Sequence, residues 1–182
     1  MKLPKLHLVC ADDELRPVMQ CVMVGKDQTF ASDAHILVRH KTSEIFKDEF
    51  VATIPDDGIM IPRKAWYIMC RKSTFKISLS DDKKLIQLHQ LDGSVISYKL
   101  FNEKGYPDAN KVIPDPSKCE PIKEIGLNSS LLDRLADGLG CNQSILRLKF
   151  FDKNKAIYVS SNYSDYESAI GIIMPTNIEQ NW

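Results

Sequence analysis

The chain has 182 residues, which suits one large domain or one domain joined to part of another, and 43% of them are hydrophobic, enough to bury a core. The 24 basic and 24 acidic side chains cancel. Tight DNA binding by a single chain is therefore not supported, because affinity for phosphates comes from a basic excess, although a local basic patch stays open. The N-terminus lacks the apolar run of a signal peptide, and no segment approaches the roughly 20 apolar residues that span a bilayer. We therefore expect a cytoplasmic protein without a membrane partner.

Residues 5–40 are predicted to form a degraded copy of a unit that recurs more clearly later. Its expected strands cover 18–24, 29–32 and 35–40, with a turn at 25–27. The helix of this copy is weak or missing, because only residues 12–16 could form a helical turn before Pro17. The segment 42–57 is charged and rich in turn formers, which predicts a connection rather than a packed element.

The most regular region runs from residue 59 to residue 100. Pro62 suits the first turn of a helix over 63–71, whose apolar face is formed by Ala65, Ile68 and Met69. Alternating apolar residues then predict three strands, over 75–79, 86–88 and 96–100. Asp92-Gly93 is a strong two-residue hairpin signal between the last two, since both residues tolerate positive φ.

The same order returns between residues 122 and 174, with a period near 60 residues. A strand over 122–127 leads to a helix over 130–139, with Ser130 as its predicted N-cap and Gly138 and Gly140 as its stop. Three further strands are predicted around 146–150, 157–159 and 166–174. The three prolines in 114–121 indicate a linker. The sequence therefore predicts an α+β fold of repeated strand-helix-meander halves, which form antiparallel sheets with two main helices.

Residues suited to catalysis are few and scattered. The five cysteines have no CxxC spacing and are expected to remain thiols, mostly as small buried apolar residues. The four histidines show no metal-binding spacing with cysteine or carboxylate, so no metal or other cofactor is expected. The sequence has no Gly-rich phosphate loop or nucleophile elbow, which favours a protein that is not an enzyme. One distant alternative is a cysteine-dependent enzyme in which His35 would activate Cys10 or Cys21.

Four short stretches carry a resemblance to a known family. They are Ala-Ser-Asp-Ala-His-Ile-Leu at 31–37, Ile-Pro-Arg-Lys at 61–64, Tyr-Pro-Asp-Ala-Asn-Lys-Val-Ile-Pro at 106–114 and Ile-Ile-Met-Pro-Thr at 172–176. In this order they resemble motifs of the bacterial DNA polymerase III sliding clamp, the beta subunit. A complete clamp is about twice as long. The resemblance implies a shortened middle domain over 1–116 and the second half of the last domain over 117–182. The chain departs from the family where Ala34 replaces a glycine, Ala109 an aromatic residue and Thr176 a methionine.

The resemblance implies a peptide-binding pocket. In the family this pocket captures an extended, glutamine-led motif through a leucine and an aromatic anchor. The residues expected around it here are Ser32, Ala34, His35, Leu37, Pro107, Lys111, Val112, Ile173, Met174 and Pro175. Methionine adapts to varied partners, and apolar walls with a few polar rims suit a peptide groove. The alternative interpretation is that these are core and turn residues kept by the fold.

The resemblance also implies a helix that faces DNA. The cations expected there are Arg63, Lys64, Arg71 and Lys72, which could slide along phosphates without reading bases. A merely solvated helix face is the favoured interpretation, because the second helix offers only Arg134.

The function that the resemblance implies is that of a sliding-clamp-like protein of DNA replication or repair. It would bind peptide motifs of polymerase or repair partners and tether them to double-stranded DNA as a homo-oligomeric ring. The alternative is a stand-alone adaptor, or a competitor for clamp partners, that does not encircle DNA.

Overall fold

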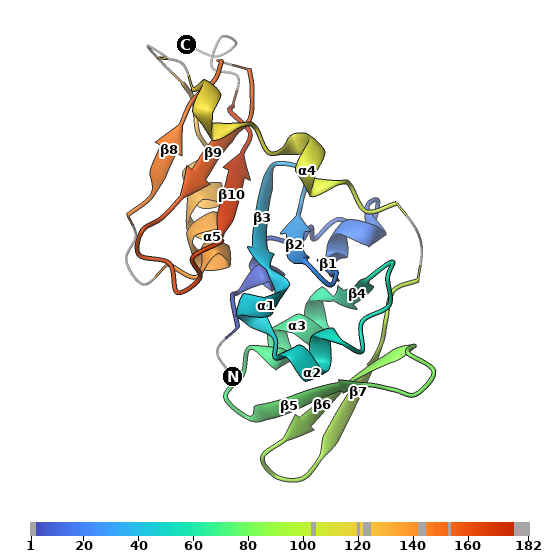
Figure 1. Ribbon diagram of the computed structural model, residues 1–182. Helices are drawn as coiled ribbons and strands as arrows, with labels where there is room; N and C mark the ends of the chain where they lie inside the picture. The colour runs from blue at the N-terminus through green and yellow to red at the C-terminus, as the bar shows by residue number, and fades with distance from the viewer. Residues whose placement is uncertain are drawn as a thin grey trace.

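The computed structural model describes residues 3–102, 105–119, 121, 125–141, 145–152 and 154–176, which form two antiparallel sheets with helices packed against them (Figure 1). The strands are β1 (Cys21–Val24), β2 (Gln28–Ser32), β3 (Ile36–Lys41), β4 (Ile59–Pro62), β5 (Thr74–Leu79), β6 (Leu85–Gln90), β7 (Val95–Lys99), β8 (Arg147–Lys149), β9 (Ile157–Ser160) and β10 (Ile170–Ile173). The helices are α1 (Thr42–Ile45), α2 (Asp48–Val51), α3 (Arg63–Met69), α4 (Ala109–Val112) and α5 (Ser129–Leu139). Short 3₁₀ turns are η1 (Leu6–Leu8), η2 (Pro17–Gln20) and η3 (Pro116–Lys118). The predicted α+β class is confirmed.

One seven-stranded sheet joins the two ends of the chain. Its strand order is β4-β1-β2-β3-β10-β9-β8, so the last strand of the chain pairs with β3. In this antiparallel pair Leu37 faces Ile172 and Ile36 faces Ile173. The two units that the sequence predicts, 1–116 and 117–182, therefore meet within a single sheet, as Figure 1 shows.

The second sheet contains β5, β6 and β7. A hairpin joins β6 to β7 at Asp92-Gly93, as predicted, but its loop is longer than the two residues expected. Gln90 donates its N–H to the Ser94 carbonyl, and of the two predicted turn residues only Gly93, with φ +85°, is in the left-handed region. A bulge lies in β5 between Thr74 and Lys76, and it shifts the alternation predicted for this strand. As a result Phe75 is 56% exposed, whereas Ile77 and Leu79 stay partly buried against the main core.

Helices α3 and α5 are the two main helices. Helix α3 follows Pro62, as predicted, and buries Ala65, Trp66 and Met69. Helix α5 begins one residue earlier than predicted, because Asn128 rather than Ser130 is its N-cap; the Asn128 side chain accepts a hydrogen bond from the Ser130 N–H at 3.0 Å.

The two glycines near the end of α5 have different roles. Gly140 ends the helix in the left-handed region with φ +70°, as predicted. Gly138 is not a stop but an internal helical residue, and a Cβ atom there would lie 2.4 Å from Val9. Glycine at this position lets the helix approach the N-terminal segment.

The first copy of the repeat differs from its prediction. Residues 12–16 are not helical, and the place of a helix is taken by η1, which packs against both α3 and α5. Strand β1 begins only at Cys21, because η2 occupies the preceding four residues. The connection at 42–57 contains α1 and α2, and the closing strand is confined to β10. Part of the strand predicted at 122–127 lies outside the described residues, and Gly126 forms an isolated bridge with Thr176.

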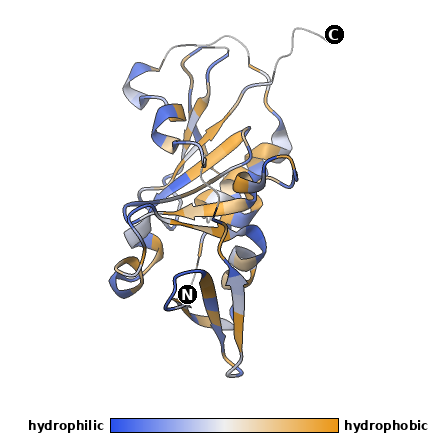
Figure 2. Ribbon diagram, turned by 90° about the vertical axis from the view of Figure 1, so that its right-hand side faces the viewer, coloured by the Kyte–Doolittle hydropathy of each residue, from blue (hydrophilic) through white to orange (hydrophobic). Residues whose placement is uncertain are grey.

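The hydrophobic residues gather in the middle of the molecule, where the seven-stranded sheet lies against the helices (Figure 2). Trp66, Leu135 and Ile157 are fully buried there, and they belong to one cluster that both parts of the chain share. A second, smaller cluster lies on the opposite face of the sheet. No helix among the described residues is long and apolar enough to cross a membrane.

Candidate functional site

Three of the stretches singled out in the sequence meet around the small apolar cluster. Its buried members are Phe30, Leu37, Ala109 and Ile172, and Tyr106 and Ile113 are packed against it. Helix α4 carries Ala109 across the end of β2 and β3 (Figure 1). We call the region formed by residues 32–37, 106–113 and 172–175 the three-loop surface.

The pairing of β3 with β10 decides which side chains face this surface. Successive strand residues point to opposite faces, so Leu37 and Ile172 lie in the small cluster, whereas Ile36 and Ile173 lie in the main core. Ile173 has 0% exposure and cannot contact a ligand at the surface. The expectation for Ile173 is therefore wrong; its neighbour Ile172 lies on the side of the small cluster, although with 5% exposure it is buried as well.

A tight turn connects β2 to β3. The Ser32 hydroxyl donates to the Ile36 carbonyl at 2.8 Å, and the Asp33 carboxylate accepts the backbone N–H groups of His35 and Ile36, both at 2.9 Å. Ala34 has φ +77°, a conformation that costs an alanine about 1 kcal/mol or more. The turn is tied to the end of the chain, since Met174 donates its N–H to the His35 carbonyl at 2.8 Å.

Tyr106 fixes the second loop to the sheet. Its hydroxyl donates to the Cys21 carbonyl at 3.0 Å and accepts the Ser32 N–H at 3.1 Å, and its ring packs edge-to-face on Phe30 at 5.2 Å. Burial raises the pKa of this phenol, so the hydroxyl stays protonated and keeps its donor role. The loop is thereby held in place before any ligand binds.

The side chains predicted for the pocket fall into three groups. Exposed are Ala34, His35, Lys111, Val112 and Met174; partly buried are Pro107 and Pro175; buried are Ser32, Leu37 and Ile173. Val112 is 43% and Met174 37% exposed, although both are apolar. His35 and Lys111 are exposed polar residues of the same three loops. Exposed apolar side chains near polar ones favour a site for a peptide or protein partner.

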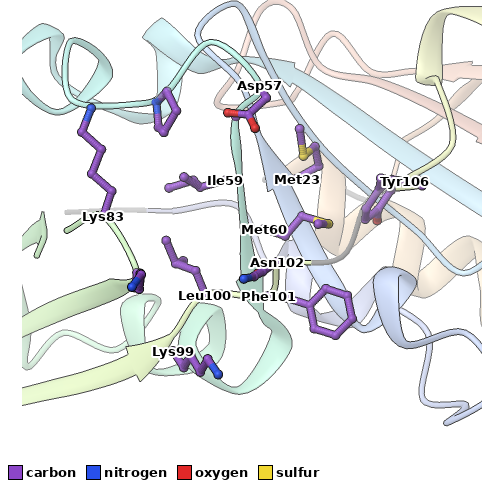
Figure 3. Close-up of a pocket in the computed structure, with 14 residues that line it drawn as sticks. Met23, Asp57, Ile59, Met60, Lys83, Lys99, Leu100, Phe101, Asn102 and Tyr106 are labelled. Carbon is purple, nitrogen blue, oxygen red and sulfur yellow. The ribbon is translucent and has the colours of Figure 1, made fainter.

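A pocket next to the three-loop surface was not predicted from the sequence. It has a volume of about 610 Å³, and Met23, Met60, Phe101 and Tyr106 line one side of it (Figure 3). Lys83 and Lys99 lie on the other side, near Ile59 and Leu100, in Figure 3. Met23 and Tyr106 also pack against the small cluster, so this pocket adjoins the three-loop surface. Met23 faces Met60 across the β1–β4 pair, and only the pairing of strands distant in sequence reveals their proximity.

The predicted DNA-facing cations are not equivalent. The Arg63 guanidinium donates to the His7 carbonyl at 3.0 Å and is ion-paired with Asp12, so it is occupied within the molecule. Lys64, Arg71 and Lys72 are exposed. On the other main helix, Arg134 donates to the Leu8 carbonyl at 2.7 Å. Both helices thus use an arginine to hold the N-terminal segment.

The thiols show no sign of nucleophilic activation. Burial raises the pKa of Cys21 to about 11 and that of Cys70 to about 12, and it raises the pKa of Cys10 further. Such thiols are protonated at neutral pH, whereas the nucleophile is the thiolate. Among the described residues, no three histidine, cysteine, aspartate or glutamate side chains are placed to hold a metal ion.

Comparison with known proteins gives a clear result for the fold. No protein-family model and no curated protein matches the sequence. Solved structures do match. The Caulobacter crescentus beta sliding clamp superposes with a TM-score of 0.67 at 15% identity, over 96% of this chain and 62% of the clamp. The Bartonella birtlesii clamp, bound to griselimycin, superposes with a TM-score of 0.67 at 14% identity, over 96% of this chain and 63% of the clamp. The Helicobacter pylori clamp, bound to a DNA ligase peptide, superposes with a TM-score of 0.67 at 13% identity, over 97% of this chain and 64% of the clamp.

The chain therefore has the fold of a DNA sliding clamp. The structures that it resembles are beta subunits of bacterial DNA polymerase III, and the chain spans less than two thirds of their length. The predicted fold class and the predicted resemblance are both confirmed at the level of the fold.

Proposed function

We propose that the three-loop surface binds a short peptide motif of a polymerase or repair protein. The observation that carries this proposal is the convergence of three distant loops on one apolar cluster, with Val112 and Met174 left exposed above it. The Helicobacter pylori clamp, which shares the fold, was solved with a DNA ligase peptide bound. The exposed polar residues His35 and Lys111 would orient the peptide backbone and a glutamine side chain.

The physical basis is the burial of two apolar anchors of the peptide. Each leucine or aromatic side chain removed from water contributes about 1.5–3 kcal/mol, and ordering an extended peptide offsets part of this. The hydrogen bonds of Ser32, Asp33 and Tyr106 hold the loops in place, which lowers the ordering cost on the protein side. Two such anchors supply at most about 6 kcal/mol, which alone corresponds to a Kd of about 40 μM.

The stand-alone adaptor is favoured over the DNA-encircling ring. The net charge is zero, and Arg63 and Arg134 are engaged with the N-terminal segment. Support for the ring comes from the fold and from the exposed cations Lys64, Arg71 and Lys72. A ring also requires several copies of this chain. Light scattering at increasing protein concentration, followed by retention on circular DNA, separates the two: a monomer that DNA does not retain is an adaptor.

A fluorescence-anisotropy titration tests the peptide site. The probe is a labelled peptide with a leading glutamine, a leucine and a phenylalanine. Met174→Ala and His35→Ala are expected to weaken binding about five- to tenfold, the equivalent of roughly 1–1.4 kcal/mol. Leu91→Ala is the matched control, since Leu91 is an apolar side chain with 72% exposure in the β6–β7 turn. Saturable binding that all three variants retain unchanged would place the peptide elsewhere and overturn the proposal.

A further inference from the structure

The pocket of Figure 3 lies on the same face of the seven-stranded sheet as the small apolar cluster. Met60 of β4 faces Met23 of β1, and Met23 faces Phe30 of β2. Directly paired residues point their side chains to the same face, so these three form one row across three strands. Phe30 is a buried member of the small cluster, and Met23 packs against that cluster. The row therefore leads from beneath the three-loop surface into the neighbouring pocket.

The two sites are close enough for one extended peptide to occupy both. Neighbouring strands lie about 4.8 Å apart, so Met60 is about 10 Å from Phe30 along the row. An extended chain advances about 3.3 Å per residue, so about three residues cover that distance. Tyr106 belongs to both sites, because it lines the pocket and its ring packs on Phe30. A peptide held on the three-loop surface would enter the pocket by continuing past Tyr106 for a few residues.

The pocket changes from apolar to cationic with distance from the three-loop surface. The nearer side carries the two methionines with Phe101 and Tyr106, and Lys83 and Lys99 lie on the other side (Figure 3). Thioether groups are polarisable and make favourable contacts with aromatic rings, so the nearer side suits an aromatic side chain. The far side suits carboxylates. The order of the two sides therefore sets an order of residues along a bound peptide, first apolar and then acidic.

The lysines of the pocket can pair with acidic groups of a partner. Lys83, Lys84 and Lys99 line the pocket with exposed side chains. Lys84 pairs with Asp82 at 3.9 Å, whereas no ion pair within the described part of the chain engages Lys83 or Lys99. Asp57 is the one acidic residue among the described residues that line the pocket. Carboxylates of a bound peptide would therefore meet cations without first breaking an internal pair.

We infer that the peptide bound by the three-loop surface extends into the neighbouring pocket with a flank of stated chemistry. About three residues beyond its anchors it carries an aromatic side chain, and acidic residues follow on the side away from the anchors. The inference rests on the function proposed above and describes the partner more closely. The same peptide, rather than a separate ligand, is the occupant, because Met23 and Tyr106 line the pocket and also pack against the small cluster.

A set of labelled peptides tests the inference by anisotropy with the full chain. One continues the glutamine-led motif with Gly-Ser-Phe-Glu-Glu, and another places the reversed flank, Glu-Glu-Phe-Ser-Gly, before the motif, so that both directions of the peptide are covered. One of the two is expected to bind about tenfold more tightly than the unextended motif. The same flank with glutamine in place of glutamate should keep about a threefold gain, which comes from the phenylalanine. The difference between the two flanks should shrink at about 1 M salt, where the Debye length is about 3 Å.

Variants of the pocket locate the flank. Lys83→Gln combined with Lys99→Gln should abolish the difference between the glutamate and glutamine flanks and leave the affinity of the unextended motif unchanged. Lys72→Gln combined with Lys76→Gln is the matched control, because it removes the same charge from exposed lysines that do not line the pocket. Met60→Ala should lower the gain of the glutamine flank at least about twofold. The Met60 methyl group should also shift more with the extended peptide than with the unextended one.

Two results would overturn this inference while the proposed function stands. One is an unextended motif that binds and gains nothing from either flank. The other is a gain that persists unchanged both in the double lysine variant and in Met60→Ala, because the flank would then lie elsewhere. An unextended motif that does not bind to the folded chain refutes the proposed function itself, and this inference with it. The unextended peptide thus tells the two failures apart.

Discussion

The three-loop surface and the helix face of α3 and α5 use their polar groups in opposite ways. On the helix face, Arg63, Trp66 and Arg134 donate hydrogen bonds to backbone carbonyls of the N-terminal segment. On the three-loop surface the hydrogen bonds lie beneath the loops, and the apolar side chains of Val112 and Met174 face outward. The first region is closed by the molecule itself, whereas the second keeps apolar side chains exposed, as the proposed peptide site requires.

The reason for the difference lies in the first copy of the repeat. Its helix is reduced to η1, a single 3₁₀ turn, which leaves carbonyl groups without helical partners. The side chains of the two full helices satisfy two of them: Arg63 donates to the His7 carbonyl and Arg134 to the Leu8 carbonyl. Trp66 adds a bond to the Pro4 carbonyl, which also accepts the Leu6 N–H. In this chain the N-terminal segment is thus held by side chains of the two full helices, among them the cations Arg63 and Arg134. Four predictions sharpen this comparison.

The largest effect is expected for Arg134→Ala. This side chain holds the Leu8 carbonyl and pairs with the Asp33 carboxylate at 2.8 Å, so it joins the N-terminal segment, α5 and the three-loop surface. Its removal takes the ion pair from the largely buried Asp33 carboxylate, which keeps only its bonds from the His35 and Ile36 N–H groups, and it takes the side-chain donor from the Leu8 carbonyl. The free energy of unfolding should fall by about 3 kcal/mol. Urea denaturation measures the change. Lys64→Ala, on the exposed side of α3, should change it by less than about 0.5 kcal/mol; equal effects of the two substitutions would contradict the account.

The next effect is a loss of stability in mild acid through His40. Its ring is buried between β3 and α5, donates from Nε2 to the Gly138 carbonyl at 2.9 Å and packs against Tyr166. Burial lowers the pKa of His40 from 6.5 to about 4. Between these values the unfolded chain binds a proton that the folded chain does not, so stability is complete above pH 6.5 and falls as the pH drops toward 4. The loss should be roughly 2 kcal/mol at pH 5.

Thermal unfolding between pH 7 and pH 5 measures this loss. His40→Gln keeps a donor for Gly138 and removes the titration, so its stability should depend less on pH. A small slope should remain, because burial and the nearby Arg63 also lower the pKa of His7. A slope equal to that of the wild type would show that His40 is not the group that titrates.

The third effect concerns the contact of α5 with the N-terminal segment. Alanine is a better helix former than glycine, which alone predicts a stabilising change for Gly138→Ala. The added methyl group would meet Val9 at 2.4 Å and Val38 at 3.2 Å, so we expect a loss of about 1–2 kcal/mol instead. Denaturation of the variant decides the sign. Gly138→Ala combined with Val9→Ala should recover part of the loss, and no recovery would show that the contact is not the cause.

The smallest effect lies in the three-loop surface. Ala34 has φ +77°, a conformation that glycine adopts freely. Ala34→Gly should raise the free energy of unfolding by up to about 1 kcal/mol while leaving the turn in place. A crystal structure and a denaturation curve of the variant check both parts. Ala52→Gly, in an exposed residue with φ −61°, is the control and should not stabilise.

The sequence predicted correctly those turns and helix starts that depend only on neighbouring residues. The turn at Asp92-Gly93 and the helix after Pro62 follow from residues within a few positions, and both are present. The clamp resemblance marked Ala34 as the replacement of a glycine, and this residue has a positive φ, a conformation that favours glycine. Elements that depend on distant partners were missed: η1 exists because α3 and α5 hold it, and the Met23–Met60 pair needs the β1–β4 register.

The candidate site shows the same limit. Its three loops could be assembled from the resemblance, yet the choice between Ile172 and Ile173 depends on how β10 pairs with β3. The sequence of two adjacent isoleucines holds no information on which of them packs in the small cluster and which in the main core. Likewise, Arg63 binds the His7 carbonyl and pairs with Asp12, and both partners lie more than fifty residues away in the sequence. The periodicity of the sequence does not reveal such contacts.

The most direct test of peptide binding at the three-loop surface is a methyl NMR titration with the glutamine-led peptide. The largest shifts are expected at Met174, Val112 and Leu37, a smaller shift at Met60 in the neighbouring pocket, and none at Leu91 in the distant hairpin. Shifts confined to other regions, or no shifts at millimolar peptide with a folded protein, would contradict the claim that this surface is the open, partner-binding region of the molecule.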